Sequence, residues 1–195
     1  MNDRYNLSPP PVVQAIQQDT TALGFSMASE PQTGSLLRTL AATKLAGAFL
    51  ELGTGTGLCT AWILDGMDRQ STLTTVDNDA AVLTIAQRHL GNDLRVTFHL
   101  SEGARFLEAL RGQTFDFIFA DTWPGKYHQL DEALTLLKPG GLYVIDDMLP
   151  QANWPAGHDV KAAALIATLE QRADLTMTKL NWASGLIAAI PGHRA

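Results

Sequence analysis

A single cysteine, Cys59, is present among the 195 residues, so no disulfide can form within the chain. This count favours a reducing compartment and excludes a small, disulfide-stapled secreted fold. No apolar run approaches the length that crosses a membrane. The first five residues, MNDRY, lack the apolar core of a secretory signal, so we expect a cytoplasmic protein with no membrane partner.

Positive charge is also scarce. The chain has 14 lysine and arginine residues against 20 aspartate and glutamate residues, a formal net charge of -6, and no cluster of basic residues. Because binding to a phosphate backbone needs a basic face, we expect no nucleic-acid partner. A hydrophobic content of 46% and a charged content of 17% are ordinary for a globular protein, and the length favours a single domain over residues 1–195.

Short apolar segments alternate with helical patterns through most of the chain. This repetition predicts an α/β fold with a doubly wound, mostly parallel sheet and helices on both of its faces. The short polar link at residues 181–185 predicts an antiparallel hairpin at the C-terminal end. We expect seven strands, at residues 48–52, 72–76, 96–100, 115–120, 142–145, 176–180 and 186–190, and helices at 60–65, 80–89, 104–110 and 127–137.

Two further helices are predicted before the sheet, at residues 12–22 and 31–45. Residues 1–45 thus form an N-terminal helical segment, and residues 46–195 hold the sheet. We expect these helices either to cover a bound ligand or to build the surface of a homodimer. Plain packing against the sheet is the alternative for the first helix.

The stretch at residues 49–57, FLELGTGTG, is the most informative part of the sequence. Its apolar run predicts a buried strand that ends beside Glu51, and Gly53, Gly55 and Gly57 predict a tight turn where a ligand can approach bare backbone. Residues 58–64 predict a helix whose free N–H groups point back at the turn. An open α/β sheet builds a nucleotide site in this way at the carboxyl end of its first strand.

The spacing of the glycines disfavours a dinucleotide. A dinucleotide fingerprint would have its third glycine at the position of Leu58, whereas this chain has it at Gly57. No lysine or arginine between residues 51 and 60 would neutralise a pyrophosphate. Glu51 would instead favour a ligand that carries a positive sulfonium and ammonium group, so a nicotinamide dehydrogenase is the weaker hypothesis.

The pattern Glu-x-Gly-x-Gly-x-Gly resembles the first motif of class I S-adenosylmethionine-dependent methyltransferases. In that family, an acid after the second strand binds the ribose hydroxyls, and Asp77 has the spacing for this role; a helix N-cap is its alternative duty. The turn at Glu102-Gly103 resembles the adenine-binding turn of small O-methyltransferases. The resemblance implies a cofactor site built from Met27, Glu51, Gly53, Thr54, Gly55, Gly57, Asp77, Asn78, Glu102, Gly103, Asp121 and Trp123.

Three carboxylates, Asp121, Asp146 and Asp147, follow the fourth and fifth predicted strands. If they converge, their negative charges need a cation or a shared proton, and oxygen ligands suit Mg²⁺. This arrangement resembles the catechol and caffeoyl-CoA type of metal-dependent O-methyltransferase, in which an Asp after the fourth strand and an Asp-Asn pair after the fifth hold one divalent ion. The resemblance implies a metal site at these three residues, with capping of strand ends as the alternative.

The chain departs from that family at two positions. Asp147 stands where the family has Asn, and Pro124, which cannot accept a proton, stands where the family has its lysine base. The general base is therefore open among Asp121, Lys126 and His158. A loop at residues 148–158 is placed to wall an acceptor pocket, where Trp123 and Trp154 can stack on a flat molecule.

We therefore expect an S-adenosylmethionine-dependent methyltransferase that methylates a small-molecule acceptor, with a hydroxyl as the first choice and Mg²⁺ as a candidate second cofactor. A metal-independent N- or O-methyltransferase on the same fold is one alternative, and the missing lysine favours it. A non-catalytic module that keeps only the nucleotide pocket is the other.

Overall fold

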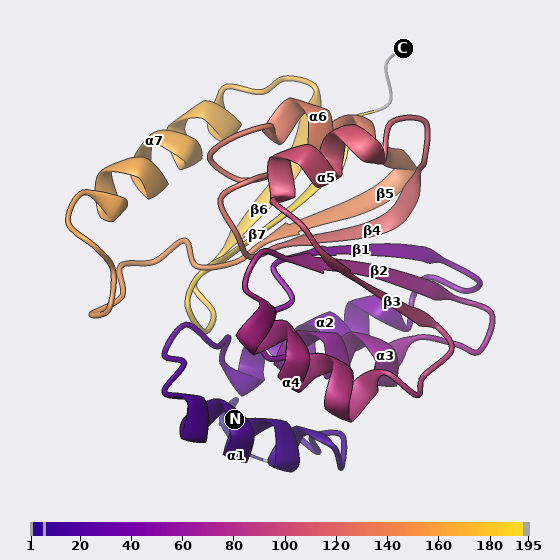
Figure 1. Cartoon of the computed structure of the whole chain (residues 1–195). Coiled ribbons are helices and arrows are strands. Elements are labelled where there is room, and N and C mark those ends of the chain that lie inside the picture. Colours follow the sequence, from indigo (N-terminus) through magenta and orange to yellow (C-terminus); the bar gives the residue numbers. More distant parts are fainter. Residues whose placement is uncertain (1, 6, 193–195) are drawn as a thin grey trace.

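A computed structural model describes residues 2–5 and 7–192 of the chain. One sheet runs through the molecule with the strand order β3-β2-β1-β4-β5-β7-β6 (Figure 1). Strands β1 to β5 pair in parallel, and β7 pairs antiparallel with both β5 and β6. The strands are β1 (Ala48–Leu52), β2 (Thr72–Asp77), β3 (Val96–Leu100), β4 (Phe115–Ala120), β5 (Leu137–Ile145), β6 (Leu175–Leu180) and β7 (Leu186–Pro191). The predicted seven-stranded α/β sheet with its antiparallel C-terminal hairpin is confirmed.

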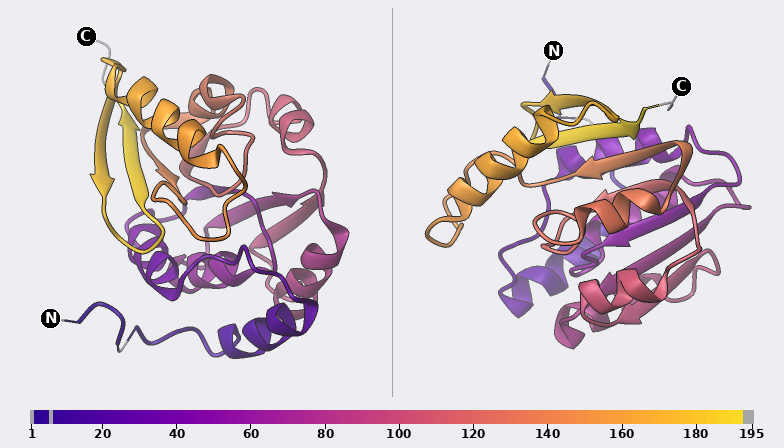
Figure 2. Two further views of the ribbon diagram at one scale, coloured as in Figure 1. Left: turned by 90° about the vertical axis from the view of Figure 1, so that its left-hand side faces the viewer. Right: turned by 90° about the horizontal axis from the view of Figure 1, so that it is seen from above.

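Helices cover both faces of the sheet (Figures 1 and 2). Helices α1 to α4 lie on one face, and α5 to α7 lie on the other. The helices are α1 (Val13–Leu23), α2 (Pro31–Ala41), α3 (Leu58–Gly66), α4 (Ala80–Leu90), α5 (Gly103–Ala109), α6 (Leu130–Thr135) and α7 (His158–Glu170). Among the described residues, no helix is both long enough and apolar enough to span a membrane.

The side-chain alternation of the central strands divides the core into two layers. In β4, Phe117 and Phe119 pack against the layer of α1 to α4, whereas Ile118 packs against the layer of α5 to α7. All three side chains are fully buried, and burial of each contributes about 1.5–3 kcal/mol to stability. This two-sided burial explains why the central strands are almost continuously apolar.

Two predicted elements around β5 have different bounds in the structure. The helix expected at residues 127–137 is only α6, and β5 begins at Leu137 rather than at residue 142. Pro139 has no N–H to donate and Gly140 has a positive φ of 75°, so a helix cannot continue there. A register shift between Phe115 and Phe117 lets the longer strand pair with β4.

Helix α7 was not predicted at all. Its buried residues Ala162, Leu165 and Leu169 follow a helical spacing, but Val160 on the same helix is exposed. The helix begins directly after the loop that crosses the carboxyl ends of β4 and β5. Its first residue, His158, is therefore held at the edge of the sheet where ligands bind in folds of this type.

Candidate functional site

The glycine turn connects β1 to α3, and two of its glycines have identifiable packing reasons. A Cβ atom on Gly53 would lie 2.8 Å from the carbonyl oxygen of Asp121, so glycine lets the end of β4 approach the turn. A Cβ atom on Gly57 would lie 2.8 Å from the Cβ of Ala86, so glycine lets α4 pack against the turn. Both residues have positive φ values, 101° and 91°. The turn is thus pinned between β4 and α4.

Asp77 lies at the end of β2 and faces the glycine turn. Its Oδ2 accepts a hydrogen bond from the Gly55 N–H at 2.7 Å, and its Oδ1 accepts one from the Asp79 N–H at 2.9 Å. The capping of α4 belongs to Asp79, whose Oδ1 accepts from the Ala81 N–H at 2.8 Å. Each Asp77 oxygen keeps a second lone pair for a ligand hydroxyl. The N-cap alternative for Asp77 is therefore wrong.

Glu51 lies behind the turn and is completely buried. Its Oε2 accepts hydrogen bonds from the hydroxyls of Thr60 (2.6 Å) and Thr75 (2.7 Å), and its Oε1 has no partner among the described residues. Burial raises the pKa of Glu51 to about 7, and the negative charge of Asp77 acts in the same direction. Glu51, Thr54 and Gly57, which were predicted to bind the cofactor, hold the turn in place and do not line the cavity beside it.

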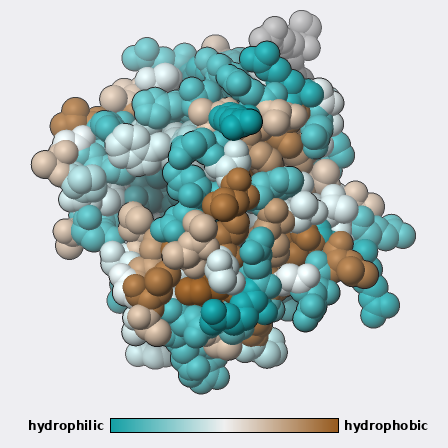
Figure 3. All heavy atoms as spheres, viewed as in Figure 1, coloured by the Kyte–Doolittle hydropathy of each residue, from teal (hydrophilic) through white to brown (hydrophobic). Residues whose placement is uncertain are grey.

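A cavity of about 730 Å³ opens at the carboxyl ends of β1, β2, β4 and β5. On the face shown in Figure 3, hydrophilic and hydrophobic residues are mixed, and the surface is hollowed beside these strand ends. Seven of the predicted cofactor residues line the cavity: Met27, Gly53, Gly55, Asp77, Asn78, Asp121 and Trp123. The last two predicted cofactor residues, Glu102 and Gly103, border a small hollow whose lining also includes Gly53, Asp77 and Asn78 of the cavity.

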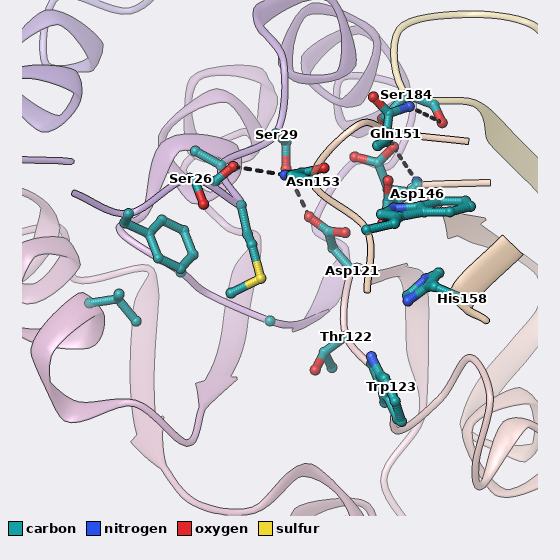
Figure 4. Close-up of a pocket in the computed structure, with 18 of the residues that line it drawn as sticks. Ser26, Ser29, Asp121, Thr122, Trp123, Asp146, Gln151, Asn153, His158 and Ser184 are labelled. Carbon is teal, nitrogen blue, oxygen red and sulfur yellow. Dashed lines mark hydrogen bonds between the residues drawn. The ribbon is translucent and has the colours of Figure 1, made fainter. Parts of the chain in front are cut away.

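Two loops that are far apart in the sequence meet over this cavity (Figure 4). The side-chain amide of Asn153 donates to the carbonyl oxygen of Ser26 at 3.1 Å. Ser29 donates its hydroxyl to Oδ2 of Asp121 at 2.8 Å. The segment before α2 and the loop before α7 therefore close the cavity from opposite sides.

Aromatic side chains lie on the side of the cavity next to the start of α7. The rings of Trp154 and His158 lie 4.4 Å apart, and the hydroxyl of Tyr127 lies 2.9 Å from His158 Nε2. Trp123 is 41% exposed and stands at the rim. Burial lowers the pKa of His158, and the positive charge of Lys126 lowers it further, which favours the neutral imidazole. Its Nδ1 has no partner among the residues that the structure describes.

The three carboxylates predicted to bind a metal each have an oxygen committed to a protein donor. Asp121 accepts from Ser29, Asp146 accepts from the Ser184 hydroxyl and the Asp147 N–H, and Asp147 accepts from Trp154 Nε1 at 2.7 Å. Asp147 has a positive φ of 60°, which turns the chain away from the strand direction. Within residues 2–5 and 7–192, no group of three or more His, Cys, Asp or Glu side chains is placed to hold a metal ion. The Mg²⁺ site at these three residues stays a prediction.

Burial dominates the electrostatics of this acidic cluster. Burial and the neighbouring charge of Asp146 raise the pKa of Asp121 well above its usual range, and burial raises the pKa of Asp146 to about 6. The Lys126 ammonium opposes both shifts. Lys126 itself is only 3% exposed and lines the same cavity, although the family alignment places the lysine two residues earlier.

Several residues that build the site carry no motif in the sequence. Ser29, Asn153 and Ser184 contact the site from the segment before α2, the loop before α7 and the β6–β7 turn. They are separated by 92, 127 and 38 positions from the residues that they bind. The only sequence signal for these contacts is that the loops contain serine and asparagine, which often form hydrogen bonds in loops.

Comparisons with known proteins agree with this geometry. Residues 50–148, half of the chain, match a family described as a methyltransferase domain. A protein of Mycobacterium avium, provisionally named an O-methyltransferase, is 31% identical over 82% of this chain and 77% of its own length. A relative from Mycolicibacterium vanbaalenii with the same provisional name is 30% identical over 72% of this chain, and the match spans 64% of that protein.

A solved structure gives the same fold. The O-methyltransferase of Bacillus cereus, crystallised with S-adenosylhomocysteine, superposes with a TM-score of 0.83 at 18% identity, over 96% of this chain and 93% of its own. The family predicted from the glycine motif is confirmed. The chain belongs to the methyltransferase family.

Proposed function

We propose that this chain is an S-adenosylmethionine-dependent methyltransferase that methylates a hydroxyl group of a small molecule. The observation that carries the proposal is the acidic cavity beside the glycine turn. Among the described residues that line it, six are acidic and Lys126 is the one lysine or arginine. A cationic sulfonium cofactor suits such a cavity, whereas a pyrophosphate would be repelled from it.

The lining residues also suggest how the cofactor lies. We expect the carboxylate of Asp77 to accept hydrogen bonds from the ribose hydroxyls, and the adenine to lie on the side of Asp77 where Glu102 and Gly103 border a small hollow. The methionine end then extends toward Ser29 and Asp121. The S-adenosylhomocysteine complex of the Bacillus cereus protein supports this cofactor class, because that protein has the same fold.

The protein contributes positioning and a proton acceptor. When bound, S-adenosylmethionine supplies an electrophilic methyl group and leaves as S-adenosylhomocysteine. The aromatic wall of Trp154 and His158 orients a flat acceptor in line with that methyl group. The neutral imidazole of His158 accepts the proton that the acceptor hydroxyl loses, and Tyr127 holds the ring through Nε2.

A methyl-transfer assay tests this function. Labelled S-adenosylmethionine is incubated with the protein and a panel of aromatic alcohols, phenols and matched amines. We expect label on hydroxyl compounds, and a rate that falls on the acidic side as His158 becomes protonated. His158→Gln should lower the rate by about 10²–10⁴-fold without changing S-adenosylhomocysteine affinity.

The control for this assay is His89→Gln, because His89 contacts Asp19 and does not line the cavity. That variant should keep the wild-type rate. Transfer to amines alone, or full activity in His158→Gln, would contradict the assignment of a hydroxyl acceptor and of the base.

A further inference from the structure

Lys126 is a buried cation in an acidic cavity. It shares the lining of that cavity with Asp121, Asp146 and Asp147, and its side chain is almost completely removed from solvent. A buried ammonium is costly unless nearby negative charge compensates it. The positive charge of Lys126 lowers the pKa of Asp121 and of Asp146, so these two carboxyl groups lie within reach of its field.

Several contacts fix the turn that carries Lys126. Gly125 precedes it with a positive φ of 83°, and a Cβ atom at that position would lie 2.4 Å from a methyl group of Leu52. The buried hydroxyl of Tyr143 in β5 donates to the carbonyl oxygen of Gly125. The Lys126 N–H donates to the carbonyl oxygen of Trp123 at 3.1 Å. These contacts hold the turn and direct the lysine into the site, with its Nζ 5.2 Å from the centre of the Tyr127 ring.

In each of the three carboxylates, one oxygen accepts hydrogen bonds from the protein. Ser29, Ser184 and Trp154 each donate to a different carboxylate of the three. A divalent ion would need oxygens from several of these groups turned toward one point, within a shell about 2.1 Å in radius for Mg²⁺. It would also have to approach the Lys126 ammonium, which carries the same sign of charge.

We propose that the Lys126 ammonium is the built-in counter-ion of Asp121 and Asp146, and that the site transfers methyl groups without a divalent metal ion. This inference rests on the proposed function and concerns the means of charge compensation at the same site. Lys126 stabilises the oxygen of the acceptor as it loses its proton, as a fixed positive charge does in a water-poor site.

The nature of the cation has a consequence for the acceptor. A divalent ion can bind two vicinal oxygens of one molecule and orient both. An ammonium is a compact point charge that serves one oxygen. The substrate class is therefore a molecule with a single reactive hydroxyl, and a neighbouring hydroxyl is not required.

Manganese binding tests the proposal without knowledge of the acceptor. The wild-type protein, saturated with S-adenosylhomocysteine at about pH 8, is titrated with Mn²⁺ and free Mn²⁺ is followed by electron paramagnetic resonance. We expect no stoichiometric binding into the millimolar range. Lys126→Met, which keeps the side-chain volume and removes the charge, should bind Mn²⁺ at least about tenfold more tightly than wild type.

Two matched variants complete the test. Lys126→Arg keeps the charge and should behave as wild type does. Lys44→Met removes one positive charge at a remote position, where the lysine donates to the Gly140 carbonyl, and should also leave Mn²⁺ binding unchanged.

The proposal is overturned if wild type binds one Mn²⁺ per chain, or if a folded Lys126→Met binds Mn²⁺ no better than wild type. Should Lys126→Met fail to fold, the wild-type titration and Lys126→Arg decide the matter. A separate result, no binding of S-adenosylhomocysteine by wild type, would count against the proposed function, whereas Mn²⁺ binding alone would count only against the role of Lys126.

Discussion

Asp77 is the residue that links the glycine turn most directly to the cofactor cavity. Both its carboxylate oxygens accept backbone N–H groups, and the side chain lines the cavity. Asp77→Ala removes the acceptors offered to the ribose hydroxyls and loosens Gly55. We predict that S-adenosylhomocysteine affinity, measured by isothermal titration calorimetry, falls by about 1–3 kcal/mol.

Asp116→Ala provides the matched control for that substitution. Asp116 lies at the opposite end of the sheet, where it accepts from Lys138 Nζ and from the Ala48 N–H, both within 2.8 Å. Its removal should leave the affinity unchanged, even if stability falls. Wild-type affinity in Asp77→Ala would mean that Asp77 only anchors the turn.

Residues within a local sequence motif could be predicted to lie at the cavity. Residues that reach the site from distant parts of the chain could not. Gly53 and Asp77 could be placed at the cavity because their spacing belongs to one strand–turn–helix unit. Glu51 has the same spacing signal, yet its carboxylate points to Thr60 and Thr75 behind the turn. Side-chain direction at a strand end depends on tertiary contacts, which no short motif records.

At the scale of elements, Glu51 of β1 ties α3 to β2 through two threonine hydroxyls. Its pKa is raised to about 7 in the folded chain, above the ordinary value of 4.5. The folded carboxyl keeps its proton at pH values where the unfolded one has lost it. Raising the pH from 4.5 through 7 therefore favours the unfolded chain, by up to about 3 kcal/mol from this residue.

Glu51→Gln should remove that dependence, because glutamine does not titrate. We predict that the free energy of unfolding by urea, measured at about pH 5 and about pH 8, differs less between the two conditions in the variant than in wild type. Thr60 and Thr75 keep an oxygen acceptor in Glu51→Gln. An unchanged difference between the two pH values would show that Glu51 ionises normally in the folded state.

Gly57 sets the contact between the glycine turn and α4. A Cβ atom there would meet both the Cβ and the Cα of Ala86, at 2.8 and 3.1 Å. Gly57→Ala should therefore lower the free energy of unfolding by about 2–4 kcal/mol. Gly112 is the control, because its φ of 88° is similar and a Cβ atom there meets nothing within 4 Å.

Gly112→Ala should cost only about 1 kcal/mol in the same urea experiment, since it adds backbone strain without a clash. Equal losses in the two variants would show that the packing of α4 is not the reason for glycine at position 57.

Helices and strands could be predicted where the apolar residues follow a clear period or where an apolar run ends sharply. Strands β1 and β4 were predicted with their observed bounds, because both are short apolar runs that end at polar or glycine residues. Helix α7 was missed because its small apolar residues give little contrast between faces. The start of β5 was missed because Lys138, Pro139 and Gly140 look like a loop, while the pairing of Leu137 with Phe115 is set by the neighbouring strand.

At the scale of the whole molecule, residues from the N-terminal and C-terminal parts of the chain meet at the site. Ser29 and Asp121 meet across 92 positions, and Asp146, directly after β5, accepts a hydrogen bond from Ser184 in the β6–β7 turn. The sheet order places the ends of β1, β2, β4 and β5 side by side, which the strand–helix alternation does predict. The single domain, the homodimer and the cytoplasmic location expected from the sequence stay predictions.

The central claim is that an acidic cavity beside the glycine turn selects a sulfonium nucleoside over a dinucleotide. Parallel calorimetric titrations of the wild-type protein with S-adenosylmethionine and with NAD⁺ test it most directly. We predict saturable binding of S-adenosylmethionine to one site per chain and no measurable heat with NAD⁺. Binding of NAD⁺ without binding of S-adenosylmethionine would contradict the account.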